Sequence, residues 1–275
     1  MSTAAVRSGS TRFVAINVIK ALGSGVLMLA IVFGLWVIAV KLVDNPFVAK
    51  GPGDVKTFLF DGDEAAANRS DIFHSLRLTL RDSVIGFAAG MLAAVVGAGL
   101  IVLSKGIEAT IMPIAMILRS VPLIALAPVI TIIFHRGLLS VAVIAGIVVL
   151  FPALVNMVFG LRAASPMMRE VVQVYGGSEW AALRKVAFPS ALPSMFASIR
   201  ISVPGAITGA LLAEWLSTGR GIGYDIVSAA GQSENNRVWA LVVVVTLVSL
   251  VGYTLAQILE SFVLARYGRD GGRAG

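Results

Sequence analysis

The chain has 275 residues, of which 57% are hydrophobic and only 13% are charged, whereas about 25% of the residues in a typical soluble domain are charged. This composition excludes an ordinary soluble protein and predicts a polytopic membrane protein, whose net charge of +7 belongs to loops rich in Lys and Arg rather than to a nucleic-acid-binding surface. Because the chain has no Cys, disulfides, thiol nucleophiles and Cys-ligated metals are excluded, and two His without an H-E-x-x-H pattern give no zinc site.

Six apolar runs are predicted to cross the membrane as helices. Each approaches or exceeds the roughly 20 apolar residues that span a bilayer. Helices are favoured because lipid offers backbone polar groups no partner, and because the runs lack the alternation of barrel strands. The first run continues to Val43, which is too far for the core of a signal peptide, so we expect it to be retained. The runs cover residues 22–43, 84–103, 107–134, 138–161, 195–216 and 238–264.

These runs divide the chain into three parts. Residues 1–70 hold an N-terminal arm, the first span and an extracytoplasmic loop; residues 71–265 hold a core with five spans; and residues 266–275 form a flexible cytoplasmic tail. Lys and Arg outnumber acids in the arm, in residues 162–200 and in the tail, whereas acids balance the cations of residues 44–82. The positive-inside rule then places both termini in the cytoplasm.

Two patterns in the core bear on helix packing. Residues 71–81, D-I-F-H-S-L-R-L-T-L-R, gather apolar side chains on one helical face and predict an interfacial helix leading into the second span. Glycines in the second, fourth and fifth spans predict close helix contacts, and prolines within the spans predict kinks. Both residue types are common in membrane helices, so alone they indicate little about function. The residues are Gly86, Gly90, Gly97, Gly99, Gly146, Gly205 and Gly209, with Pro113, Pro122, Pro128, Pro152 and Pro204.

The longest polar interruption in the second half of the chain is R-E-V-V-Q-V-Y-G-G-S-E-W-A-A-L-R-K-V-A-F-P, which begins at Arg169. Residues 170–175 suit a helix, and Gly176 marks its end because glycine adopts the positive φ of a helix C-cap. Ser178 predicts the N-cap of a second short helix that ends near Pro189. We therefore expect a helical hairpin outside the bilayer, polar on its outer surface and apolar on its inner surface. A solvated connector is the alternative.

Polar residues inside the spans are candidates for a translocation path, and each also has a structural explanation. Arg119 lies about 18 Å into the third run at 1.5 Å per residue. A charge at that depth usually faces protein or water, so both attraction of an anion and a packing or snorkelling role stay open. Glu214 is a candidate for receptor binding or for bracing an outer gate, or it lies at the interface beside Trp215. Ser202 and Thr208 either face the path or hydrogen-bond their own helix.

The spacing within the hairpin is specific. Glu170-Val171-Val172 is followed after three residues by Gly176, and after nine more by Val186-Ala187-Phe188-Pro189. This spacing resembles the E-A-A-x3-G-x9-I-x-L-P motif of the membrane subunits of binding-protein-dependent ABC importers, with apolar replacements and with the Glu, Gly and Pro intact. The similarity covers residues 72–226, including R-S-V-P-L-I-A-L-A-P-V and L-L-A-E-W-L, and is greatest to the nitrate, sulfonate and taurine branch.

The resemblance implies an all-α integral membrane protein with about six transmembrane helices, a type I ABC importer permease fold whose hairpin is the cytoplasmic coupling helix. It implies a bacterial plasma membrane location, a second permease copy in a homodimer, two ABC ATPase subunits and an extracytoplasmic substrate-binding protein. ATP and Mg are expected in those ATPase subunits, because this chain lacks a G-x-x-x-x-G-K-[ST] run; the chain itself is expected to be no enzyme and to hold no metal or cofactor. The implied docking residues are Glu170, Val171, Val172, Gly176, Gly177, Trp180, Arg184 and Pro189.

Two rival functions stay open. A secondary transporter or channel without an ATPase partner would need polar or ionisable residues along a path within one chain, and the spans hold few. A membrane-embedded enzyme would need paired carboxylates or His clusters in the spans, which the sequence does not offer. The branch implies a small anionic cargo resembling a sulfonate, taurine or nitrate, while a carboxylate or a cofactor precursor is not excluded.

Overall fold

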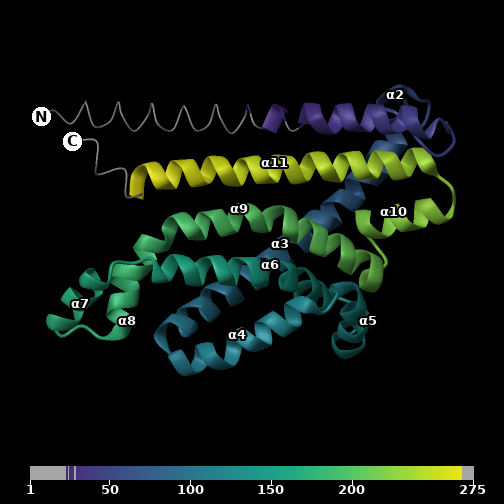
Figure 1. Ribbon diagram of the computed structural model, residues 1–275. Helices are drawn as coiled ribbons and strands as arrows, with labels where there is room; N and C mark the ends of the chain where they lie inside the picture. The colour runs from purple at the N-terminus through teal and green to yellow at the C-terminus, as the bar shows by residue number, and fades with distance from the viewer. Residues whose placement is uncertain (1–22, 24, 28, 268–275) are drawn as a thin grey trace, which may run out of the picture.

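A computed structural model describes residues 23, 25–27 and 29–267, and within these residues the chain is helical without any strand. Among the described residues, five helices are long and apolar enough to cross a membrane: Gly25–Val43, Ala65–Leu103, Leu138–Arg162, Glu179–Thr218 and Asn235–Ala265. The helices lie roughly along one direction and give an elongated molecule (Figure 1). The predicted all-helical membrane fold is therefore confirmed for the described part of the chain.

The helical elements after Gly25–Val43 include three π-helical turns, labelled η, in which backbone bonds run from residue i to i+5. In chain order the elements are α2 (Pro52–Lys56), η1 (Thr57–Asp61), α3 (Ala65–Leu103), α4 (Lys105–Ser120), α5 (Leu123–Phe134), α6 (Leu138–Arg162), α7 (Pro166–Val174), α8 (Glu179–Ala182), η2 (Leu183–Ala187), α9 (Phe188–Ala213), η3 (Glu214–Thr218), α10 (Ile222–Gly231) and α11 (Asn235–Tyr267).

The third predicted span, residues 107–134, is not one helix. It is divided into α4 and α5 by a break at Val121-Pro122, where Pro122 has φ −58° and ψ 119°. Proline lacks an amide hydrogen and disfavours helical backbone at the residue before it, so the helix ends just ahead of Pro122. Pro113 and Pro128 lie inside α4 and α5 without ending them.

Residues 71–81 are not a separate interfacial helix, because α3 runs without interruption through them into the predicted second span. Only part of the predicted apolar face is buried. Ile72 is 5% exposed and belongs to a core cluster, whereas Phe73 is 68% exposed. The long helix thus runs from Ala65 to the centre of the molecule without a break.

Close packing of α3, α6 and α9 forms the centre of the fold, as the glycines predicted. A Cβ on Gly86 would collide with the Cβ of Ala145, and a Cβ on Gly209 would lie 2.6 Å from the Ala145 Cα. Van der Waals contact between small residues is the force that holds helices together where lipid gives no hydrophobic drive. The main cluster comprises Ala94, Ala98, Ile101, Ala153, Leu154, Met157, Val158, Leu161, Ala164, Leu183, Ala187 and Ala191.

The outer helices attach to this centre less closely. α11 lies along α9 (Figure 1). The helix Gly25–Val43 contacts α11 through Trp36, whose ring stacks on that of Trp239 with centroids 5.8 Å apart. The Trp36 indole N–H donates to the Lys50 carbonyl at 3.0 Å, so the same side chain also fixes the connection that follows.

We predict that Gly90→Ala lowers the thermal stability of the protein in detergent while Gly205→Ala does not. A Cβ at position 90 would lie 2.8 Å from the Val149 Cβ, whereas one at position 205 meets its nearest neighbour, the Val148 Cγ1, at 3.6 Å. Overpacking costs about 1–3 kcal/mol, more than the gain of up to about 1 kcal/mol in helix propensity that both variants share. Melting curves in one detergent compare the two; equal midpoints would contradict the packing described.

Candidate functional site

The polar stretch after α6 forms the predicted helical hairpin, comprising α7, a turn and α8. Pro166 occupies the first turn of α7, and the helix ends at Val174. Gly176 has a φ of +79°, and the Ser178 hydroxyl accepts the Ala181 N–H at 3.3 Å. The glycine turn and the serine N-cap are therefore confirmed. Gly177 has no room for a side chain, since a Cβ there would lie 2.6 Å from the Val172 Cγ1.

The predicted end of the second hairpin helix is wrong. Helical structure continues from Glu179 through Pro189 to Thr218, a stretch of 40 residues. Pro189 lies in the first turn of α9, immediately after the π-helical turn η2, and a proline is tolerated in a first turn because its missing N–H has no required partner there. The hairpin arm and the fifth span are thus one helix.

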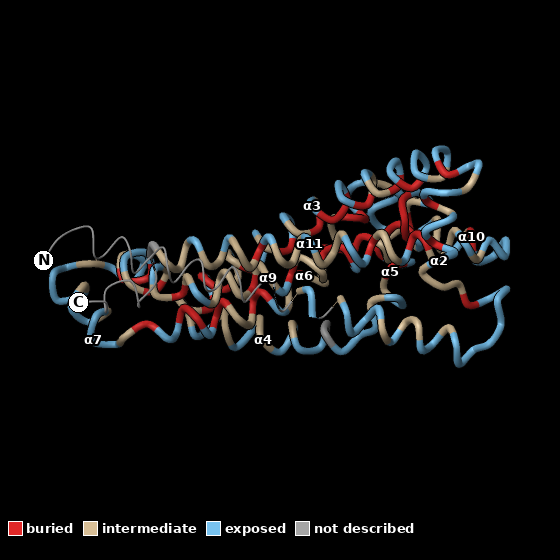
Figure 2. Tube along the Cα trace, turned by 90° about the horizontal axis from the view of Figure 1, so that it is seen from above, coloured by how far each residue is buried: buried red, intermediate tan, exposed pale blue. Residues whose placement is uncertain are grey.

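The two arms of the hairpin differ in burial. Leu183 and Ala187 of η2 are fully buried against α3 and α6 in the main cluster. In contrast, α7 has no buried residue, as Figure 2 shows at the end of the molecule that carries it. One arm is therefore held by the core, and the other rests on the opposite arm and on its connections to α6 and to the turn.

Polar contacts between the arms come from a residue that the sequence motif did not single out. Glu179 accepts a hydrogen bond from the Gln173 side chain at 2.5 Å and pairs with Arg169 at 3.5 Å. Glu170 is exposed, and the described part of the chain offers it no ion pair or side-chain hydrogen bond. Contacts across a turn depend on how the arms fold back, so the linear pattern carried no signal for Glu179.

The outer surface of the hairpin is more apolar than predicted. The exposed fractions are 84% for Val174, 87% for Tyr175 and 58% for Trp180. Met167, Val171 and Val174 follow the i, i+4, i+7 spacing of one helical face, and all three are exposed. We call Met167, Val171, Val174, Tyr175 and Trp180 the exposed apolar set. Of the other predicted docking residues, Val172 is half-buried, and Arg184 and Pro189 are exposed.

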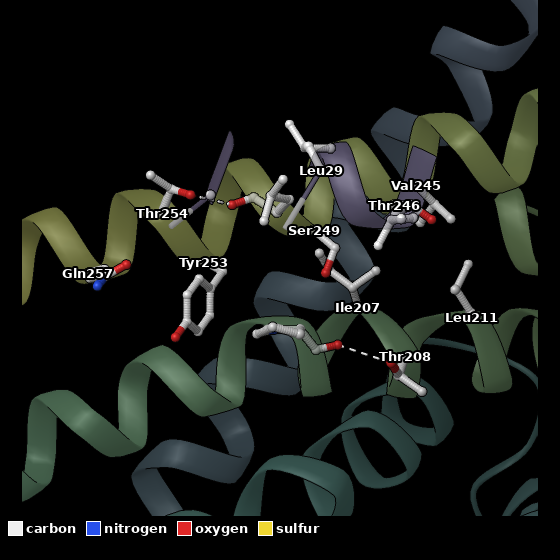
Figure 3. A pocket seen from close by; sticks show the side chains of 14 residues that line it. Leu29, Ile207, Thr208, Leu211, Val245, Thr246, Ser249, Tyr253, Thr254 and Gln257 are labelled. Carbon is white, nitrogen blue, oxygen red and sulfur yellow. Dashed lines mark hydrogen bonds between the residues drawn. The ribbon is translucent and has the colours of Figure 1, made fainter. Parts of the chain in front are cut away.

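The translocation-path candidates lie in different places. Thr208 lines a cavity of about 630 Å³ between Gly25–Val43, α9 and α11, but its hydroxyl donates to the Pro204 carbonyl of its own helix at 3.1 Å (Figure 3). Ser202 is 1% exposed, and its hydroxyl has no partner among the described residues. Arg119 lies near the end of α4, and its side chain is outside the described part of the chain.

The cavity is apolar over most of its length. The hydroxyls of Thr246 and Thr254 donate to carbonyls of α11, at 2.7 and 2.8 Å, so these side chains satisfy their own helix. Tyr253 and Gln257 bring further polar groups to the wall, at the end away from Leu211 (Figure 3). The lining residues are Gly25, Leu29, Val32, Pro204, Ile207, Thr208, Leu211, Val245, Thr246, Ser249, Leu250, Tyr253, Thr254 and Gln257.

An ion pair between α9 and α11 lies close to this polar end. Glu260 lies 3.0 Å from Arg200, while a pairing of Glu260 with Arg266, which proximity along the chain predicts, falls outside the described side chains. The Arg200 guanidinium also lies 5.9 Å from the centre of the Tyr253 ring. Arg200, near the start of the predicted fifth span, is thus inside α9 and linked to the last helix.

Glu214 is not an interfacial residue, because its side chain is completely buried. Its Oε2 atom accepts the Thr79 hydroxyl at 3.0 Å and the Gly223 N–H at 2.8 Å, while its Oε1 atom has no partner among the described residues. Thr79 in turn accepts the Ile222 N–H at 2.9 Å. The carboxyl group therefore joins η3, α3 and α10. Within the part of the chain that the structure describes, no three His, Asp or Glu gather where they could hold a metal ion.

Comparisons with known proteins agree on one family. Residues 86–265 match the model of the binding-protein-dependent transport system inner membrane component. A formylaminopyrimidine transport permease protein of Halalkalibacterium halodurans is 26% identical over 84% of this chain and 90% of its own length. A putative aliphatic sulfonates transport permease protein of Bacillus subtilis is 27% identical over 70% of each chain. A nitrate import permease protein of Synechococcus elongatus is 25% identical over 66% of this chain and 65% of its own length.

We predict that Ser178→Ala loosens the start of α8, whereas Ser165→Ala leaves the start of α7 unchanged. Both serines are N-cap residues, but only Ser178 accepts a backbone N–H with its side chain. Loss of such a cap costs about 1 kcal/mol, which corresponds to about a fivefold larger open population. Hydrogen exchange at the Ala181 amide measures the change, and equal exchange in both variants would show that the cap contributes nothing.

Proposed function

Because the chain belongs to the family of binding-protein-dependent transport system inner membrane components, we propose that its hairpin docks on separate ATPase subunits, which drive the transport. The protein is the membrane-spanning permease subunit of an ABC importer. It spans the membrane several times, and the family is one of transport permeases rather than of catalytic proteins. ATPase subunits and an extracytoplasmic binding protein are the general partners of such a permease.

The observation that carries this proposal is the exposed apolar set, three of whose members lie on α7, the arm without buried residues. Val174 and Tyr175 are more than four-fifths exposed, at 84% and 87%. Burying one such side chain contributes about 1.5–3 kcal/mol, so a protein groove that covers several of them gains enough to hold the hairpin. The other arm passes straight into the buried centre, so a force on the hairpin acts directly on the fifth span.

The assembly follows from the same reading. The active importer holds two copies of this chain with the translocation path between them, and two ATPase subunits that bind ATP and Mg on the side of the hairpin. The hairpin and both termini lie in the cytoplasm of a bacterial cell, in keeping with the Lys and Arg of the arm, hairpin and tail. Glu170, Arg184 and the exposed apolar set supply the docking contacts, and Gly176 and Gly177 form the turn of the hairpin.

The cargo is a small polar solute. Relatives are named for formylaminopyrimidine, aliphatic sulfonates and nitrate, and these three name the cargo candidates for this chain. An anion is the first candidate, because Arg119 lies in α4 beside the helix break at Pro122, where a cation in an apolar segment attracts a negative solute. Arg119, Ser202 and Thr208 remain the proposed path residues of this reading.

We predict that the tagged chain, expressed in its native membrane, purifies with an ATPase subunit that carries a G-x-x-x-x-G-K-[ST] sequence, and that Val174→Asp abolishes this association. A charge at a site that must enter an apolar groove removes the gain from burial. Phe47→Asp is the matched control, since Phe47 is 63% exposed and lies outside the hairpin. Peptide mass spectrometry of the eluate gives the result.

Two outcomes would contradict this prediction. If neither the unchanged chain nor the control carries an ATPase, the docking proposal falls, and a channel or secondary transporter becomes the better reading. If Val174→Asp retains as much ATPase as Phe47→Asp does, the hairpin is not the docking element, although the protein is still a permease of its family.

We predict that uptake by cells carrying the importer discriminates among the cargo candidates. An anionic cargo gives saturable uptake of nitrate or an alkanesulfonate that falls about tenfold in Arg119→Gln, because losing about 1.4 kcal/mol of attraction between the cation and the anion lowers affinity tenfold. Arg136→Gln serves as the control. Uptake of formylaminopyrimidine that is unaffected by Arg119→Gln would show that the cargo is not recognised by its charge.

A further inference from the structure

The hairpin and Glu214 belong to one helix. The segment Glu179–Thr218 is helical for 40 residues, beginning in the hairpin and ending in η3. At 1.5 Å per residue, Glu179 and Glu214 are about 50 Å apart along this helix. Figures 1 and 2 place α7 at one end of the molecule and α10 at the other. A displacement of the hairpin is therefore a displacement of the helix that carries Glu214.

At the far end the chain reverses and begins α10. Gly219 has a φ of +68° and Gly221 a φ of +91°, so the turn depends on backbone angles that other residues rarely adopt. α10 then packs against α3, α9, η3 and α11, with Ile222 completely buried among apolar residues of these helices. The turn and α10 thus form a unit that packs against η3, the last turn of the Glu179–Thr218 helix.

The Glu214 carboxyl group satisfies the start of α10. Gly221 is the N-cap residue of α10 and has no side chain to accept the first amide hydrogens. The Gly223 N–H donates to Glu214, and the Ile222 N–H donates to Thr79, whose hydroxyl donates to Glu214 and also lies 3.1 Å from the Ser75 carbonyl. Two of the four amides that a helix leaves unpaired at its start are therefore bonded by side chains of α3 and η3.

The Glu214 carboxyl group fits against the start of α10 because the facing residues there are glycines without side chains. A Cβ on Gly221 would collide with the Glu214 carboxyl carbon, and a Cβ on Gly223 would lie 2.7 Å from the Leu211 Cα. A second polar connection runs in parallel, because Ser75 donates to Asp225 at 2.5 Å and Asp225 lies 3.8 Å from Arg237 of α11. α10 is consequently tied to α3 and η3 by hydrogen bonds and to α11 by an ion pair, as well as by packing.

These bonds are not what stability alone would select. The Glu214 Oε1 and Asp82 Oδ2 atoms are buried without partners among the described residues, and an unpaired buried polar atom costs free energy. An apolar residue at position 214 would avoid that cost but could not fix the direction in which α10 begins. Directional bonds that specify one arrangement at a cost in stability are typical of polar groups whose role is positional.

We propose that Glu214 is a positioning residue of transport, whose carboxyl group fixes α10 to the end of the Glu179–Thr218 helix and to α3, so that movement of the hairpin is delivered to the opposite end of the molecule. This inference rests on the proposed function for the origin of the movement. The attachment of α10 itself does not depend on that function, and the two parts are tested separately.

The attachment is tested by thiol labelling of the full-length chain, which has no native Cys. A cysteine introduced by Ala229→Cys lies on the buried face of α10, since Ala229 is 2% exposed, and it should react slowly with a maleimide. One introduced by Ala230→Cys, at an exposed position, should react quickly in every background and serves as the control. We expect Glu214→Ala and Thr79→Val to speed labelling at position 229 about tenfold, an ordinary size for a coupling between sites.

Conservative variants distinguish the effect of losing the hydrogen bonds from the effect of losing side-chain volume. Thr79→Ser and Glu214→Gln retain an oxygen that accepts the α10 amides and should keep labelling slow, and Glu234→Gln, an exposed position at the far end of α10, should have no effect. If Glu214→Ala fails to accumulate, Thr79→Val decides the matter because it preserves the side-chain shape. Slow labelling in both Glu214→Ala and Thr79→Val, or in Thr79→Val alone where Glu214→Ala cannot be made, would overturn the proposal.

The delivery of movement is tested in the complex of this chain with its ATPase. Labelling at position 229 is compared without nucleotide and with ATP plus vanadate, which traps the ATPase. We expect the rate to change with trapping in the parent and the change to be lost in Thr79→Val while ATP hydrolysis persists. No change in the parent, or the same change in Thr79→Val, would overturn delivery through Glu214. Absence of an ATPase from the purified parent would instead overturn the proposed function, leaving the attachment result valid.

Discussion

The close approach of α6 to α3 and α9 is the constraint on which the rest of the structure depends. At Gly86, Gly90 and Gly209 the facing atoms leave no room for a side chain, so the helix backbones meet directly. Within a bilayer the lipid is as apolar as the side chains, and only such contact and a few polar bonds can hold helices in one arrangement. The position of α9 follows from this contact, and α9 carries both the hairpin arm and Glu214.

The helix Glu179–Thr218 gains its importance from being uninterrupted, although it contains three prolines, at positions 189, 193 and 204. A break would leave backbone groups unpaired in lipid, which costs several kcal/mol for each group. The π-helical turns η2 and η3 lie at its two ends, where the chain leaves the centre of the fold. The exposed hairpin arm at one end and the buried hydrogen bonds of Glu214 at the other therefore belong to one continuous helix.

Local and compositional signals were enough to predict five of the six spans, the turn at Gly176 and the N-cap at Ser178, because each depends on neighbours in the sequence. The family, too, followed from the spacing of a few residues. What the sequence could not reveal depends on distant partners. Pro122 breaks its helix while other prolines do not, and Glu214 is buried because α3 and α10 close over it. Arg200 is paired across helices with a residue 60 positions later.

The turn η2 also has an evolutionary consequence. A π-helical turn holds one residue more than the α-helical turn it replaces, so it acts as a one-residue insertion in a continuous helix. Loss of one residue between Leu183 and Ala187 would restore regular α-helical turns, and because the wide turn accommodates its extra residue locally, the segments on either side would keep their orientation around the axis. Deletion of a single codon there would change the local side-chain packing of η2 while leaving the hairpin and α9 in their present orientation, so related permeases with and without this residue could dock in the same way.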